Sequence, residues 1–228
     1  MSFESLVVVG TLAAVLLVLA AMVIVARARP RSGAADALGA GDFEGAWRTA
    51  RTTAPAERDE LMAAAVAAKH LLRLEESDEL LSRVAGSDPA DGEVWLERGL
   101  VAAYRGDFES ASRALARAEG LRSDLLESIT LHRAWLELVT GAPRAARHRF
   151  EEVESSLENK LRDDLGGGEP LFAEWFLQAA DLWAASGDAE RARWAREQGA
   201  AAAPGSRLAA ALATGRRPPL VDDATAPA

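Results

Sequence analysis

The chain has 228 residues, of which 49% are hydrophobic and 27% charged, so it can bury a core of good size and is not disordered as a whole. Its formal net charge is −9, and residues 32–228 carry −11 once Glu4, Arg27, Arg29 and Arg31 are set aside. A body this acidic repels the phosphates of nucleic acids, which argues against nucleic acid as a partner. The lack of cysteine excludes disulfides, thiolate metal sites and thiol nucleophiles.

The N-terminal part predicts a membrane anchor. A short segment, residues 1–5, precedes 21 uncharged residues, Leu6 to Ala26. As a helix rising ~1.5 Å per residue, this run spans a hydrocarbon core of ~30 Å. A cleaved signal peptide is the competing interpretation, but it calls for a basic segment followed by a shorter apolar run.

A basic juxtamembrane linker, residues 27–33, follows the apolar run and contains three arginines. By the positive-inside rule, the domain behind this linker lies in the cytoplasm. The chain is rich in Ala and Arg and poor in Lys, which is typical of GC-rich bacterial genomes. We therefore expect a single-pass protein of the bacterial inner membrane that spans the membrane once.

A short pattern returns along residues 34–213: a Gly, then an acidic or small residue, then an Ala five positions after the Gly. It reads Gly41-Asp42-Phe43 with Ala46, Gly106-Asp107-Phe108 with Ala111, Gly141-Ala142-Pro143 with Ala146, and Gly187-Asp188-Ala189 with Ala192. The spacing of 35 between Gly106 and Gly141 fits a helix-turn-helix repeat of about 34 residues.

The best-formed unit runs from Gly92 to about Ser123. Its diagnostic residues are Trp95, Gly99, Gly106-Asp107-Phe108, Ala111, Ala118 and Leu121. This pattern suits two closely packed helices. The first helix has a large side chain, Trp95, and a small residue, Gly99; Gly106 marks the turn, and small residues follow on the second helix. This unit resembles the tetratricopeptide repeat (TPR) family, although Ser123 stands where the family usually has a proline.

The remaining units vary around the same pattern. The second unit is weaker, and we expect its second helix to begin near Asp78-Glu79-Leu80. The fourth and fifth turns are 46 residues apart, which places an insertion at residues 155–170, with a helix from Leu157 to Leu165 that Gly166-Gly167-Gly168 breaks. Residues 214–228 are predicted to be a disordered tail. The predicted fold class is all-α: a TPR-like solenoid, residues 34–213, behind one N-terminal transmembrane helix, residues 6–26.

The resemblance implies a partner-binding groove, because the first helix of each TPR unit lines the concave face of the superhelix. Carried over by register, the groove residues are Lys69, Arg73, Glu97, Leu100, Tyr104, Leu131, His132, Trp135, Leu138, Gln178 and Asp181. Such a groove has an apolar and aromatic floor and suits an amphipathic helix or a segment of mixed polarity. Alternatively, Trp135 and Leu138 simply pack against neighbouring helices.

The leading functional hypothesis is a membrane-anchored adaptor or scaffold that binds a protein or peptide partner, itself membrane-associated, at the cytoplasmic face of the inner membrane. Two alternatives stay open: an extracytoplasmic TPR factor that assists envelope assembly or secretion, and a structural subunit of a membrane complex. No nucleophile elbow, HExxH motif or phosphate loop occurs, and His70, His132 and His148 are too scattered to suggest a zinc site. We expect no enzyme activity, cofactor or metal.

Overall fold

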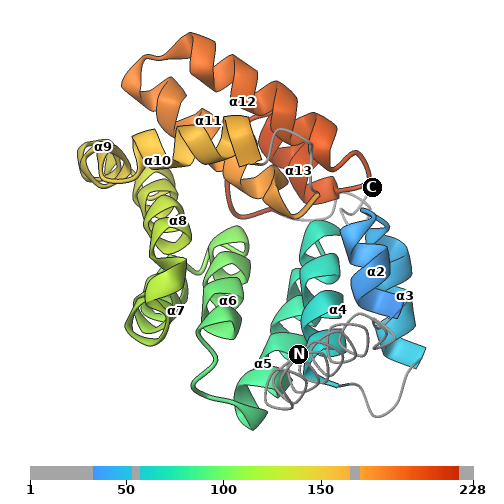
Figure 1. The fold of residues 1–228 in the computed structure, drawn as a ribbon. Coiled ribbons are helices and arrows are strands. Elements are labelled where there is room, and N and C mark those ends of the chain that lie inside the picture. Colours follow the sequence, from blue (N-terminus) through green and yellow to red (C-terminus); the bar gives the residue numbers. More distant parts are fainter. Residues whose placement is uncertain (1–32, 53–56, 165–169, 221–228) are drawn as a thin grey trace, which may run out of the picture.

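The computed structural model describes residues 33–52, 57–164 and 170–220, and all regular structure in these ranges is helical (Figure 1). The elements are α2 (Gly33–Gly39), α3 (Phe43–Thr52), α4 (Arg58–His70), α5 (Leu74–Ser87), α6 (Gly92–Tyr104), α7 (Phe108–Leu121), η1 (Ser123–Leu125), α8 (Leu126–Val139), α9 (Pro143–Glu151), α10 (Glu154–Asn159), η2 (Lys160–Asp164), η3 (Pro170–Phe172), α11 (Ala173–Ser186), α12 (Ala189–Ala202) and α13 (Arg207–Ala213). Consecutive helices pack in pairs, α2 with α3, α4 with α5, α6 with α7, α8 with α9 and α11 with α12. This is a TPR-like helical repeat fold, so the repeat part of the predicted fold class is confirmed.

The glycines of the sequence pattern stand where the backbone turns between the two helices of a pair. The φ value is 76° at Gly41, 82° at Gly106, 87° at Gly141 and 90° at Gly187. This is a left-handed backbone conformation that residues other than glycine rarely adopt. At Gly106 the N–H of the next residue, Asp107, donates to the carbonyl of Ala102 at 2.9 Å. The same hydrogen bond spans the other three turns, which makes each of them a Schellman motif.

The second unit turns in the same way without a glycine. Leu72 has φ 60°, and the N–H of Arg73 donates to the carbonyl of Ala68 at 2.9 Å. Helix α5 therefore begins at Leu74, and residues 78–80 lie inside it. The expected start near Asp78 was wrong, because a leucine in a left-handed turn gives no signal in the sequence.

Small residues let the paired helices approach closely. A Cβ atom at Gly99 of α6 would lie 2.8 Å from the side chain of Leu115 in α7, nearer than real Cβ contacts come. Large aromatic side chains fill the space between pairs, with Tyr104 and Trp135 in edge contact at 5.5 Å between ring centroids. Both are fully buried, so the core alternates between close helix contacts and large side chains.

The C-terminal helices return to the N-terminal ones, so the stack closes on itself (Figure 1). The ring of His70, in α4, lies against Phe43 at 4.3 Å between centroids. Its Nδ1 atom is 2.9 Å from Oγ of Ser206, the residue that caps α13. Pro170 of η3 similarly lies against the α2–α3 turn at Gly41. Helices α4, α6, α8 and α11 thus surround a central space.

The predicted transmembrane element of the fold class needs correction. Across the described ranges, no helix has both the length and the apolar character required to cross a membrane. The predicted span, residues 6–26, lies outside these ranges, as does most of the basic linker at residues 27–33. The fold class is accordingly an all-α helical repeat, and the structure gives no support to a transmembrane helix.

The insertion and the tail both contact the repeats. Helix α10 and the π-helical turn η2 bury Leu157 and Leu161 completely, and Glu154 accepts a hydrogen bond from Nε1 of Trp183 at 2.8 Å. Residues 165–169 and 221–228 lie outside the described ranges. Residues 214–220, expected to begin a disordered tail, instead follow the domain surface. There Leu220 is buried, and its N–H donates to the carbonyl of Tyr104 at 2.7 Å.

Candidate functional site

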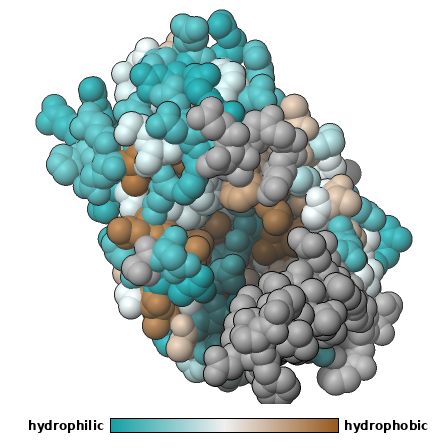
Figure 2. Space-filling model, in the orientation of Figure 1, coloured by the Kyte–Doolittle hydropathy of each residue, from teal (hydrophilic) through white to brown (hydrophobic). Residues whose placement is uncertain are grey.

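A pocket of about 510 Å³ opens at the centre of the closed stack, between α2, α4, α6, α8 and the start of α11. Figure 2 shows the centre of this face hollowed, with polar and apolar surface side by side. The apolar wall consists of Ala35, Leu38, Met62, Ala63, Val66, Leu96, Leu100, Leu125, Leu171, Phe172 and Trp175. The charged lining consists of the acidic residues Asp59, Glu93, Glu97, Asp124, Glu127 and Glu174, and the basic residues Arg58, Lys69 and Lys160.

Helical periodicity explains how α4 and α6 present these side chains. Met62, Val66 and Lys69 follow one another at steps of four and three along α4 and therefore share one face. The same spacing aligns Glu93, Glu97 and Leu100 on α6. The two helices thus face each other across the pocket, α4 with an apolar stripe that ends at Lys69 and α6 with two carboxylates followed by a leucine.

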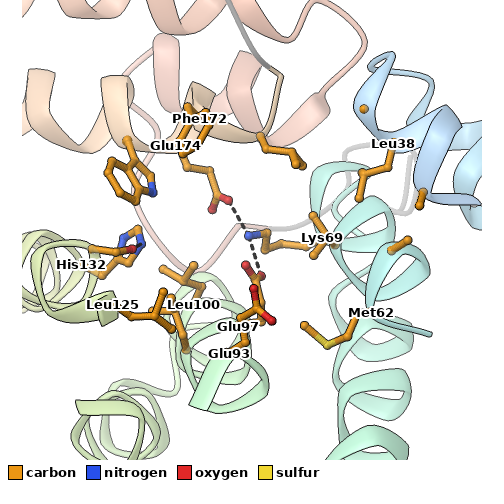
Figure 3. A pocket seen from close by; sticks show the side chains of 18 of the residues that line it. Leu38, Met62, Lys69, Glu93, Glu97, Leu100, Leu125, His132, Phe172 and Glu174 are labelled. Atoms are coloured by element: carbon orange, nitrogen blue, oxygen red, sulfur yellow. Dashed lines mark hydrogen bonds and ion pairs between the residues drawn. The ribbon is translucent and has the colours of Figure 1, made fainter. Parts of the chain in front are cut away.

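Lys69 carries a buried charge at the base of the pocket, with a side chain only 1% exposed. Its ammonium group donates to Glu97 Oε2 at 2.8 Å and to Glu174 Oε2 (Figure 3). Burial lowers the pKa of Lys69, but the carboxylates of Glu174 and Glu97 more than offset this, so the pKa lies above its usual value. Lys69 therefore stays charged and holds α4, α6 and α11 together.

A chain of hydrogen bonds continues from Glu174 behind the pocket. The hydroxyl of Tyr104 donates to Glu174 Oε1 at 2.6 Å, and Gln178 Nε2 donates to that hydroxyl at 2.9 Å. Burial raises the pKa of Tyr104, and the neighbouring carboxylate of Glu174 raises it further, so the phenol keeps its proton.

This chain of hydrogen bonds ends at His132, where the positions of the bonding partners assign the tautomer of the imidazole ring. Nδ1 of His132 is 2.6 Å from Oε1 of Gln178, which can only accept, so Nδ1 carries the proton. Nε2 then accepts from the hydroxyl of Ser128 at 3.1 Å. Burial lowers the pKa of His132, although its bond to Gln178 opposes this, and the ring is neutral. The whole network joins the four inner helices into a rigid base for the pocket.

His70 is the buried group that the network leaves partly unsatisfied. Its Nε2 has no hydrogen-bond partner and lies 3.9 Å from Glu174 Oε2. Burial, reinforced by the charge of Lys69, lowers the pKa of His70 to about 3. A neutral imidazole thus lies beside the ion pair at the point where α13 meets α4.

The structure distributes the predicted groove residues over four environments. Those that line the pocket are Lys69, Glu97, Leu100 and His132; those that support it from behind are Tyr104 and Gln178; those that pack in the core are Leu131, Trp135 and Leu138. Arg73 and Asp181 lie outside the lining: Arg73 stacks 3.6 Å over the ring of Trp47, and Asp181 accepts from Arg196 at 2.9 Å. For Trp135 and Leu138 the structure therefore shows the alternative interpretation, in which both side chains pack against neighbouring helices.

Sequence reasoning missed most of the apolar wall. Met62 and Val66 share the stripe of Lys69, so a helical projection of residues 58–70 would have found them. Phe172 and Trp175 reach the pocket only because the chain returns to α2 and α4 after the insertion, and no local pattern indicates this closure. Within the described residues, no group of three or more His, Cys, Asp or Glu side chains is arranged to hold a metal ion.

Comparison with known proteins yields one structural similarity. The crystal structure of MamA protein aligns with 75% of this chain and 87% of its own, at 16% identity and a TM-score of 0.46. No protein-family model matches the chain, and no curated protein matches it. At this identity and TM-score, the similarity adds nothing to the fold that the coordinates themselves establish.

Proposed function

We propose that the domain is a protein-interaction scaffold whose central pocket binds an amphipathic polypeptide segment bearing lysine or arginine. Helical repeats of this kind usually bind proteins through the concave surface that their stacking creates. Here that surface is a pocket of about 510 Å³, a size that accepts a few side chains of a docked segment.

The composition of the pocket lining carries this proposal. Leu38, Met62 and Val66 form an apolar wall, and acidic side chains outnumber basic ones around it. An apolar wall excludes a purely charged ligand, and a surplus of carboxylates disfavours an acidic one. A segment with one apolar face and flanking cations satisfies both conditions.

The buried network fixes the geometry of this site. Glu97 is held by Lys69 at its inner side, while its own side chain remains 19% exposed to the pocket. Glu93 is 48% exposed and pairs with Arg58 at 3.0 Å. An incoming cation can share these carboxylates without a rearrangement of the helices, because the ion pairs at the pocket rim are open to solvent.

A titration with designed peptides tests the proposal. The probe is a short, capped, fluorescent helix-forming peptide of Leu, Ala and Lys, and its counterpart has Glu in place of each Lys. We expect the Lys peptide to bind and the Glu peptide to bind at least about tenfold more weakly by fluorescence anisotropy. Substitution Glu93→Lys should weaken binding of the Lys peptide about threefold to tenfold, whereas Glu190→Lys, at an exposed site on α12, should not.

Two results would refute the proposal. Equal affinity for the two peptides would show that the carboxylates do not select the ligand. Equal losses for Glu93→Lys and Glu190→Lys would show that the peptide responds to overall charge and not to the pocket.

The membrane location expected from the sequence stays a prediction. The residues that motivate it, an apolar run and three arginines, lie outside the described ranges. Fractionation of cells that express the full chain tests it directly, and recovery in the soluble fraction alone would contradict it.

A further inference from the structure

A second concavity, of about 460 Å³, lies between α5, α6 and α7 and is lined by four arginines. We call it the arginine groove, and its charged residues are Arg98, Arg105, Arg113, Arg117, Asp78 and Asp107. It shares no lining residue with the central pocket. The lining itself thus holds four guanidinium groups and two carboxylates, in a domain whose sequence is strongly acidic.

Helix α6 separates the two sites. Glu93, Glu97 and Leu100 face the central pocket, while Arg98, Ala102 and Arg105 face the arginine groove. At 100° per residue, these two sets lie on opposite sides of the helix. One side of α6 is therefore acidic and apolar, and the other is basic.

Among the described residues, two aspartates in the lining and two glutamates beside it accompany the four arginines, and these carboxylates engage every guanidinium of the groove except that of Arg117. Asp78 accepts from Arg105 at 3.1 Å and lies 3.6 Å from Arg98. Asp107 is engaged at the start of α7, where its carboxylate accepts the N–H of Ser110 at 3.1 Å. Glu75 and Glu109 stand beside the groove and pair with Arg105 and Arg113. In the described part of the chain, Arg117 forms no ion pair and donates to the carbonyl of Pro89 at 3.0 Å.

Trp95 holds two of these arginines in place. The guanidinium of Arg117 lies 3.9 Å from the centroid of the indole, and that of Arg98 lies 5.0 Å from it. The indole N–H donates to the carbonyl of Pro89 at 3.0 Å, which fixes the ring. Stacking on one fixed ring therefore orders both guanidinium groups before any ligand binds.

We propose that the arginine groove is a second binding site, for a carboxylate-rich peptide segment of a partner protein. Guanidinium groups bind carboxylates through two parallel N–H donors, and those held by stacking lose little freedom on binding. The groove extends over several turns of α6 and α7, which suits a peptide chain. With its two sites of opposite preference, the scaffold can hold a basic and an acidic partner on either side of α6.

Fluorescence anisotropy on the full chain tests this site. The probe is a short, capped, fluorescent peptide of Glu, Asp and Gly, compared with the same peptide carrying Lys in place of each acid. We expect the acidic peptide to bind preferentially, and the double variant Arg98→Gln/Arg117→Gln to bind it about tenfold more weakly. The matched control Arg144→Gln/Arg193→Gln removes two exposed arginines from α9 and α12 and should change affinity less than about twofold.

Circular dichroism establishes that the double variant keeps its helicity. If it does not, Arg113→Gln replaces it, because that side chain is 63% exposed and pairs only within α7. Equal binding of the acidic and basic peptides, or equal losses in the groove and control variants, would overturn the proposal. Displacement of the peptide by an equal concentration of inorganic phosphate would also overturn it, since that would show a simple anion site.

Discussion

Lys69 and Glu174 stand 105 residues apart in the sequence and form a buried ion pair that joins α4 to α11 at the base of the central pocket. Glu97 completes the coordination of the ammonium group, and Tyr104 binds the second oxygen of Glu174. Because burial of an unpaired charge is costly, each member of this cluster depends on the others. The ion pair therefore ties the closure of the helical stack to the shape of the pocket.

Removal of one partner of this pair should destabilise the domain strongly. We expect Lys69→Met to lower the free energy of unfolding by about 3–5 kcal/mol, because it leaves Glu174 buried without its cation. The double variant Lys69→Met/Glu174→Gln should recover part of this loss, since the neutral amide needs no counter-charge. Urea unfolding of the two variants measures both effects, and a double variant less stable than Lys69→Met would contradict this account.

Stability should fall as the solution becomes mildly acidic, because His70 is neutral in the fold. The pKa of His70 is about 3 in the folded state, against 6.5 in an unfolded chain. Below pH 6.5 the unfolded chain therefore binds a proton that the folded state does not, and the free energy of unfolding declines as the pH drops towards 3. Above that range the full stability is present. His132, whose pKa is also lowered by burial, acts in the same direction.

Urea midpoints measured from about pH 7.5 to about pH 5.5 test this dependence on His70. The variant His70→Asn should show a shallower decline than the parent chain. An unchanged slope would mean that His70 takes up its proton in the folded state.

Glycine substitutions should change stability with opposite signs according to the local backbone. Gly187→Ala places a side chain at φ 90° in open space and should cost about 1 kcal/mol. Gly106→Ala should cost more, because its Cβ would also lie 3.3 Å from Pro219. Gly86→Ala, in the last turn of α5 with nothing near its Cβ, should stabilise by about 0.5 kcal/mol. Thermal unfolding of the three variants checks the order, and a stabilised Gly187→Ala would contradict the turn assignment.

The contact between Ser206 and His70 should hold α13 in place. Ser206 Oγ accepts the N–H of Ala209 at 2.9 Å and contacts Nδ1 of His70, so Ser206→Ala removes a helix cap and leaves a buried nitrogen without a partner. A loss of about 1–3 kcal/mol follows. Hydrogen exchange should accelerate in α13 (Arg207–Ala213) and remain slow in α6 (Gly92–Tyr104). A uniform acceleration over both helices would show that α13 does not open separately.

Much of the repeat architecture follows from local chemistry. Gly41, Gly106, Gly141 and Gly187 indicate the turns because a left-handed backbone favours glycine, and the small residues after them permit close helix contact. Leu72 occupies the equivalent position in the second unit, and nothing in its identity shows this. The helical repeat was thus predictable, whereas the start of α5 was not.

The candidate site was less predictable, because it depends on closure of the stack. An open TPR-like superhelix would expose the first-helix residues Tyr104, Trp135 and Gln178, which is why they were expected in a groove. In the closed stack α8 packs against both α6 and α11, so these side chains are buried between the helices and serve as core or support. Phe172 and Trp175, which follow the insertion, supply part of the pocket wall in their place.

Site-specific photocrosslinking in intact cells tests the central claim, that the pocket holds a polypeptide partner, most directly. The crosslinker replaces Met62 on the apolar wall, and a control replaces Arg144, an exposed residue of α9. We predict adducts from position 62 alone, whose crosslinked peptide, identified by mass spectrometry, contains apolar residues and lysine or arginine. Adducts in equal amounts from both positions, or none from position 62, would contradict the assignment of the central pocket as the binding site.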